Sequence, residues 1–106
     1  AITVLFRDVK SINKISDFNK TFFREKKLEF TSTSLHSKNL FLIRTFPTQK
    51  EAMDYYRALQ NNLDVQKVLK GENTLNYIIS TENFRKLFKS KDEPNYLTFF
   101  KENYIS

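Results

Sequence analysis

Side chains that could support catalysis or metal binding are few in this sequence. His36 is the only histidine, and it stands beside Ser37, Lys38 and Asn39 with no neighbouring carboxylate. A general base or a metal ligand needs convergent partners, so we interpret it as a solvated turn residue. There is no cysteine and one glycine, Gly71, which excludes thiolate chemistry, disulfides and a glycine-rich phosphate loop.

Two adjacent carboxylates, Asp92 and Glu93, come nearest to an acid–base pair. They directly precede Pro94, and acidic residues and proline are both favoured in the first turn of a helix. We therefore interpret them as a helix start. Because no nucleophile motif or metal-ligand spacing stands elsewhere, the sequence predicts a protein that is not an enzyme, with no catalytic, cofactor-binding or metal site.

Positive charge is the other chemical feature of the chain. The 18 Lys and Arg outnumber the 12 Asp and Glu, for a net charge of +6, which fits an anionic partner and equally an ordinary lysine-rich exterior. The cations form two clusters, Arg24/Lys26/Lys27 and Arg85/Lys86/Lys89/Lys91. RNA-recognition domains carry a basic-Gly-aromatic consensus on their third strand, which the run NLFLIRTF lacks. We therefore disfavour nucleic acid as a partner and expect both clusters to be solvated faces.

The elements that must position these residues are clearest at the centre of the chain. The continuous apolar run at 40–43 predicts a buried strand over 39–46. Thr48 then stands three residues before Glu51, the spacing of a capping box. A helix over 48–61 is therefore predicted, with Thr48 as its cap.

Alternating and helical spacings predict the remaining elements. Further strands are expected at 2–7, at 28–35 (thinly apolar, hence an edge) and at 74–80. The expected helices are one opened by Ser11 with Ile12, Ile15, Phe18 and Phe22 on one face, one over 64–70 closed by Gly71, one capped by Ser80 with Phe84, Leu87 and Phe88, and a closing helix from Asp92 with Tyr96, Leu97, Phe99, Phe100 and Tyr104.

This order predicts an α+β fold of the ferredoxin-like class. Right-handed crossovers and one hairpin turn β-α-β-β-α-β into an antiparallel sheet of spatial order 4-1-3-2, and two short helices follow at the C-terminal end. At 106 residues the chain predicts a single domain over 1–106. It opens with Ala1 in strand-like sequence, so we interpret it as a fragment of a larger chain. No apolar run approaches the ~20 residues of a membrane helix.

One face of the predicted sheet is too apolar for water. If Arg7 and Arg44 point away from the long helices, Leu5, Leu42 and Ile78 become neighbours in one row. Such a stripe needs a cover, either the closing helix through Leu97, Phe100 and Tyr104 or a second protein, and we favour the helix. The predicted partner surface comprises Leu5, Leu42, Ile78, Arg85, Lys86 and Lys89.

Four segments together resemble a known family: SDFNKTFF, FLIRTFPTQKEAMDYYRAL, YIISTENFRKLFKSKD and YLTFFKENY. The chain resembles the C-terminal domain of the large tetratricopeptide-repeat lipoproteins of Bacteroidota associated with gliding motility and type IX secretion. The resemblance implies an outer-membrane lipoprotein facing the periplasm, with helical repeats ahead of this domain and other proteins of the same envelope machinery as partners. It implies no catalytic or ligand positions.

Three hypotheses follow from the residues and the resemblance. The first is a non-catalytic interaction or scaffold domain without cofactors or a small-molecule substrate, linked to the membrane only by a lipid anchor outside this fragment. The second is a small-molecule-sensing regulatory domain of the same architecture, and the third is a weak nucleic-acid binder. Binding of amino acids would favour the second, and RNA binding with a steep salt dependence would favour the third.

Overall fold

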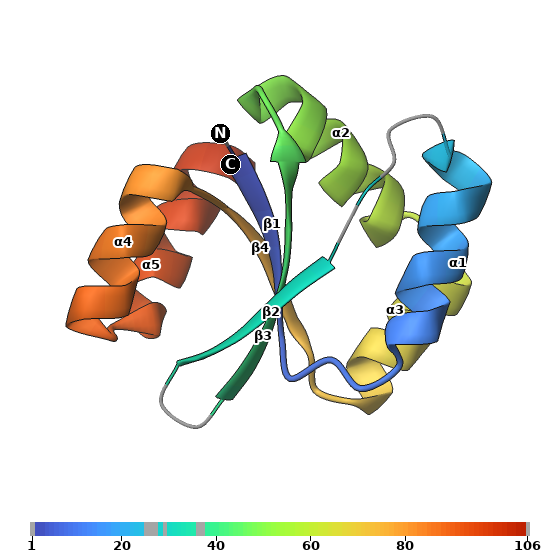
Figure 1. The fold of residues 1–106 in the computed structure, drawn as a ribbon, viewed down its shortest axis with the longest axis horizontal. Helices are drawn as coiled ribbons and strands as arrows, with labels where there is room; N and C mark the ends of the chain where they lie inside the picture. The colour runs from blue at the N-terminus through green and yellow to red at the C-terminus, as the bar shows by residue number, and fades with distance from the viewer. Residues whose placement is uncertain (1, 25–27, 29, 36–37, 106) are drawn as a thin grey trace.

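The computed structural model describes residues 2–24, 28, 30–35 and 38–105, which form a sheet with helices on both faces (Figure 1). The strands are β1 (Ile2–Arg7), β2 (Phe30–Leu35), β3 (Lys38–Phe46) and β4 (Leu75–Ser80). The helices are α1 (Ile12–Phe22), α2 (Gln49–Gln60), α3 (Leu63–Gly71), α4 (Thr81–Ser90) and α5 (Glu93–Phe100), followed by a π-helical turn, η2 (Lys101–Ile105).

The four strands form one antiparallel sheet in the order β2-β3-β1-β4. From the opposite edge this is the predicted order 4-1-3-2, and β2 lies at an edge as its thin apolar content indicated. Strand β1 is central, and its Val4, Leu5 and Phe6 are completely buried. Apolar side chains on both faces of a strand require cover on both sides, which explains the two helical layers.

Helices α1, α2 and α3 lie on one side of the sheet, and α4 and α5 lie on the other (Figure 1). The first layer is organised around the buried ring of Tyr55 in α2, which contacts Phe18, Phe23 and Phe46 at centroid distances of 5.0–5.8 Å. Its hydroxyl donates to the side-chain oxygen of Asn19. Burial raises the pKa of Tyr55, so the phenol stays protonated and keeps donating this bond.

Three helix starts follow the predicted local chemistry. Thr48 accepts a hydrogen bond from Glu51 N (3.3 Å), Ser80 from Asn83 N (3.1 Å) and Asp92 from Asn95 N (3.2 Å). Side-chain oxygens at this position satisfy amides that have no partner within the helix. The predicted caps at Thr48 and Ser80 are therefore confirmed. Asp92 was predicted in the first turn of α5, and the structure places it one position earlier, as the cap.

The start of α1 and the end of α3 differ from expectation. Ser11 makes no side-chain bond to its own helix; its hydroxyl donates to Glu72, whose carboxylate also accepts from Lys10 N (2.9 Å) and Ser11 N (3.1 Å). Helix α3 includes Gly71, and the left-handed conformation falls on Asn73 (φ 54°). Asparagine tolerates that conformation, so no glycine is needed there.

The last residue of the predicted apolar face of α1, Phe22, does not lie in the core. Phe22 is 60% exposed, whereas Asn19 is buried against Tyr55 and Phe23 packs on the same ring. The helix ends at Phe22, so Phe23 adopts a non-helical conformation, from which its ring packs into the core. Of the cluster expected to end this helix, Arg24 is exposed beyond it, while Lys26 and Lys27 lie outside the described residues.

Candidate functional site

The closing helix α5 packs on the sheet face opposite α1, α2 and α3. The rings of Tyr96 and Phe100 contact Tyr77 of β4 at 5.6 and 6.2 Å, and Tyr96 donates a 2.6 Å hydrogen bond to the carbonyl of Ile78. Phe100 also meets Tyr56 of α2 at 5.4 Å, around the edge of β4. The closing helix therefore covers this face of the sheet at β4, with Phe100 buried and Leu97 and Tyr104 half-buried, and α4 packs on the same strand. Contact of α5 with Leu5 and Leu42 stays a prediction.

The composition of that stripe differs from the prediction at one strand. Leu5 pairs with Leu42 on one side and with Tyr77 on the other, whereas Ile78 pairs with Val4. The prediction for Ile78 is wrong because a one-residue shift in phase moves every side chain of a strand to the other face. Leu5, Leu42 and Ile78 are all at most 1% exposed, so the apolar half of the predicted partner surface lies inside the domain.

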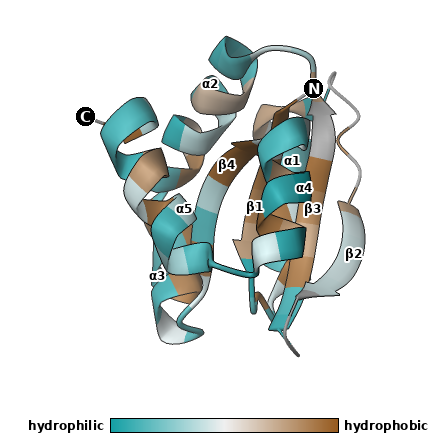
Figure 2. Cartoon of the chain, turned by 90° about the vertical axis from the view of Figure 1, so that its left-hand side faces the viewer, coloured by the Kyte–Doolittle hydropathy of each residue, from teal (hydrophilic) through white to brown (hydrophobic). Residues whose placement is uncertain are grey.

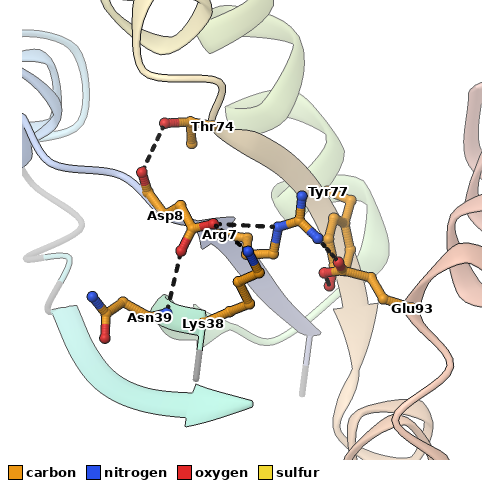
Figure 3. Close-up of polar contacts among 7 residues, drawn as sticks. All are labelled: Arg7, Asp8, Lys38, Asn39, Thr74, Tyr77 and Glu93. Carbon is orange, nitrogen blue, oxygen red and sulfur yellow. Dashed lines mark hydrogen bonds and ion pairs between the residues drawn. The ribbon is translucent and has the colours of Figure 1, made fainter. Parts of the chain in front are cut away.

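A partly buried ion pair fixes the start of α5 to the end of β1 (Figure 3). Arg7 Nη1 contacts Glu93 Oε1, and the Tyr77 hydroxyl donates to Glu93 Oε2 at 2.6 Å. Glu93 is only 6% exposed. A carboxylate can be buried at acceptable cost when it is paired and hydrogen-bonded, and both conditions are met here. Glu93 therefore anchors α5 to the sheet, a role that its position at a helix start did not reveal.

Asp8 organises the turn beside this ion pair (Figure 3). It adopts a left-handed conformation (φ 62°) after β1, and its carboxylate accepts from Asn39 N at 3.3 Å. Asp8 Oδ2 also lies 3.8 Å from Arg7 Nε and 3.9 Å from Lys38 Nζ. Arg7 Nε is buried and has no hydrogen-bond partner among the residues that the structure describes. Arg7 therefore lies between two carboxylates that hold it at the end of the sheet.

The interactions of this cluster stabilise the fold by holding α5 and the turn after β1 in place. Burial, reinforced by the hydrogen bond to Glu93, raises the pKa of Tyr77, so its phenol remains a donor. In the described part of the chain, no three His, Cys, Asp or Glu side chains are grouped so that they could hold a metal. One sequence signal indicated that Arg7 needs a partner, although it did not identify Glu93. Strand alternation places Arg7 on the same face as Leu5, and a cation among apolar residues requires a carboxylate nearby.

The charged half of the predicted partner surface lies on α4. Arg85, Lys86 and Lys89 are all exposed. In the view of Figure 2, α4 and α5 lie in front of the apolar strands of the sheet. A groove of about 200 Å³ lies between these two helices. Its lining includes Lys86, Leu87, Ser90, Asp92, Tyr96 and Phe99. The structure therefore places one predicted residue, Lys86, at a concave surface.

A second hollow, of about 460 Å³, lies among α2, α3 and the start of β4. Its walls include the amides Gln60, Gln66 and Asn76. Gln60 donates to Asn76 at 3.3 Å, Asn76 donates to the Leu5 carbonyl at 3.0 Å, and Gln66 donates to the Leu59 carbonyl at 2.8 Å. These donors are thus engaged in holding the fold.

Other sequence predictions fall elsewhere. His36 lies outside the described residues, so its expected place in a turn stays a prediction. Among the residues that are described, none of the helices has the length and apolar character needed to cross a membrane. Comparison with known proteins found no matching family model, no matching curated protein and no matching solved structure.

Proposed function

We propose that this chain is a non-catalytic protein-interaction domain. The observation that carries the proposal is the outer layer formed by α4 and α5. It is anchored by the Arg7–Glu93 pair, yet it presents a groove, the exposed ring of Phe99 and three exposed cations of α4 to solvent. Rigid walls with an apolar floor and a charged rim are features of protein recognition surfaces.

We further assign the domain to the ferredoxin-like class. The assignment is supported by the β-α-β-β-α-β order of β1, α1, β2, β3, α2 and β4 around a sheet of order β2-β3-β1-β4, with α3 inserted between α2 and β4. Helices α4 and α5 are then the two C-terminal additions. Because such folds serve many functions, the interaction role rests on the outer layer and not on the topology.

The setting that we propose is the periplasmic side of a bacterial outer membrane. It is supported by the resemblance of four segments to the terminal domain of tetratricopeptide-repeat lipoproteins of the gliding and type IX secretion machinery. In that setting the partners are other proteins of the same envelope machinery. The complete gene tests this directly: a signal peptide, a lipobox cysteine and upstream helical repeats are expected, and their absence would contradict the setting.

Site-specific photo-crosslinking in cells tests the interaction role. A benzoyl-phenylalanine is placed in the full-length protein at Phe99 of α5, at Leu63 of α3, or at Thr31 of β2, which are exposed positions on different elements. A discrete adduct with another protein at any of them is the expected result. Absence of adducts at all three would contradict the proposed function.

A small-molecule-sensing domain is the second candidate. It is favoured by the hollow among α2, α3 and β4, because about 460 Å³ lies within the ~300–1,000 Å³ typical of ligand sites. The expected result for this alternative is a saturable thermal shift with a free amino acid, abolished by Asn76→Leu. Photo-adducts without any such shift would favour the interaction role.

A further inference from the structure

The groove between α4 and α5 has walls that are fixed in place. Leu87 of α4 is buried, and α5 is held by the hydrogen bond from Tyr96 to the Ile78 carbonyl and by the Arg7–Glu93 pair. Lys91, in the left-handed conformation (φ 58°), makes the turn between the helices. A partner would therefore meet a preformed surface, which lowers the entropic cost of binding.

The floor of the groove accepts an apolar side chain. Leu87, Tyr96 and Phe99 contribute to its lining, and the rings of Tyr96 and Phe99 lie 5.6 Å apart. Phe99 is 41% exposed, so part of its ring has no cover in the domain. A volume of about 200 Å³ falls below the ~300–1,000 Å³ of small-molecule sites, and it suits one large side chain of a protein segment.

The charge around the groove indicates which charge the partner should carry. The lining itself carries one cation, Lys86, and one acid, Asp92. On α4 and in the turn beside the lining, the exposed cations Arg85, Lys89 and Lys91 outnumber the exposed acid Glu82. Lys86 Nζ lies 3.8 Å from Glu82 Oε1, but both side chains are more than 70% exposed, so the pair is weak. Asp92 is engaged in capping α5. The rim is therefore positive on balance.

We infer that this groove binds an acidic segment of another protein that inserts one large apolar side chain between α4 and α5. The inference rests on the proposed interaction role and adds the partner's chemistry. A second copy of this chain fits less well, because its net charge of +6 would bring like charges together, which opposes association. An acidic segment would be attracted, and its rate of association would fall with rising salt.

The test uses a short peptide with a central phenylalanine flanked on both sides by acidic residues, titrated into the isotopically labelled protein. Amide shifts are expected at Asn83, Ser90 and Asn95, all of which line the groove, and binding should weaken as salt rises. A peptide with alanine at the centre should bind about tenfold more weakly. Absence of binding, or shifts located elsewhere, would overturn the inference.

Two pairs of matched variants separate charge from the apolar floor. Lys86→Glu/Lys89→Glu should weaken peptide binding about tenfold, whereas Lys67→Glu/Lys70→Glu, exposed at the same spacing on α3, should leave it within about twofold of the unmodified protein. Phe99→Ser should weaken binding, and Phe88→Ser, equally exposed but outside the groove lining, should not. Equal effects within either pair would overturn the inference.

The crosslinking described above keeps the two proposals distinguishable. Adducts at Leu63 or Thr31, with none at Phe99, would leave the interaction role standing and reject the groove. An adduct at Phe99 that is lost in Lys86→Glu/Lys89→Glu would support both. Circular dichroism melts of every variant should confirm that each is folded at the temperature of the binding experiment.

Discussion

Arg7 and Glu93 illustrate how a single polar contact can determine where a whole helix lies. Arg7 ends the central strand and Glu93 begins the last helix, 86 positions later. Desolvating either charge alone would be costly, and each offsets part of that cost for the other. The Tyr77 hydroxyl satisfies the second carboxylate oxygen. The pair therefore favours one position of α5 over others that would bury similar apolar area.

Glu93→Ala should lower the free energy of unfolding by roughly 2–4 kcal/mol. The value falls somewhat below the ~3–5 kcal/mol for fully buried pairs, because a quarter of the Arg7 side chain is exposed. Urea denaturation at neutral pH measures the loss. Glu82→Ala, which removes the exposed pair with Lys86, is the control and should cost at most ~1 kcal/mol. Similar losses in both variants would contradict the anchoring role.

Thr48→Ala should destabilise the domain by about 0.5–2 kcal/mol, because α2 loses the acceptor for the Glu51 amide. Glu51→Ala should cost less. A reciprocal capping box between the two side chains stays a prediction, and the double variant tests it in a denaturation cycle. Its loss should fall short of the sum of the single losses if the residues act together, and strict additivity would count against a box.

Glu72 should give the domain a local acid sensitivity. Partial burial acts to raise the pKa of Glu72, but the bonds from the Ser11 side chain and the Lys10 and Ser11 amides, with the charge of Lys10, outweigh it and hold the pKa below its usual value. A carboxylate with a lowered folded pKa stabilises the fold above its unfolded pKa, and this contribution is lost as the pH falls through the folded pKa.

The comparison of the unmodified protein with Glu72→Gln tests this assignment. The unmodified protein should be more stable at neutral pH, and the difference should disappear below about pH 4. Thermal melts across the acid range follow both proteins. A difference that stays constant over that range would show that the charge of Glu72 does not stabilise the start of α1.

Among single residues, local contacts could be predicted and distant ones could not. The caps at Thr48 and Ser80 depend on amides three positions away, so the local sequence identified them. The local sequence also placed Asp92 at the start of its helix, although not as the cap that it forms. Ser11 has the same chemistry, yet it bonds to Glu72, 61 positions away. No local pattern contains that information, and the Arg7–Glu93 pair was missed for the same reason.

At the scale of elements, periodicity located the strands and helices more reliably than it assigned their faces. The central strand and the helix after it lie within one or two residues of their predicted bounds. Strand β4 was placed correctly along the chain but with the wrong face inward. The segment from Tyr77 to Ile79 is apolar at every position and buried throughout, so alternation carried no signal there, and only pairing with β1 settles the phase.

Removing residues 92–106 should expose the sheet face that α5 covers. Tyr96 and Phe100 would be lost from the core, along with the Glu93 partner of Arg7. With ~1.5–3 kcal/mol for each large side chain buried, the loss should reach several kcal/mol and promote dye binding and self-association. The milder variant Phe100→Ala should cost ~3–5 kcal/mol if truncation prevents folding. A truncated domain that is monomeric and equally stable would contradict the covering role.

For the whole molecule, the order of the strands followed from general rules of chain connection, whereas the presence of a second helical layer on the sheet did not. Right-handed crossovers and a hairpin gave the observed order. The second helical layer was expected only as one of two possible covers, because nothing in the residues 92–105 themselves states which surface they contact.

Hydrogen exchange should rank the strands by their position in the sheet. The amides of β1, paired on both sides and buried, should exchange at rates near those of global unfolding. The amides of β2, which pairs only with β3 and has exposed residues at 31, 32 and 34, should exchange fastest among the strands. Equal protection of β2 and β1 would indicate that another molecule covers the β2 edge.

The central position of β1 has a consequence for synthesis in the cell. Its partners β3 and β4 and the helix that covers it all lie later in the chain, α5 some 90 residues later. Within this domain β1 leaves the ribosome before its partners, and Arg7 lacks Glu93 until the start of α5 has emerged, several seconds later at ~5–20 residues per second. Sheets built from such distant pairings also fold slowly. The nascent chain therefore exposes apolar side chains that favour aggregation, and a chaperone that binds them at this stage would raise the yield of folded domain.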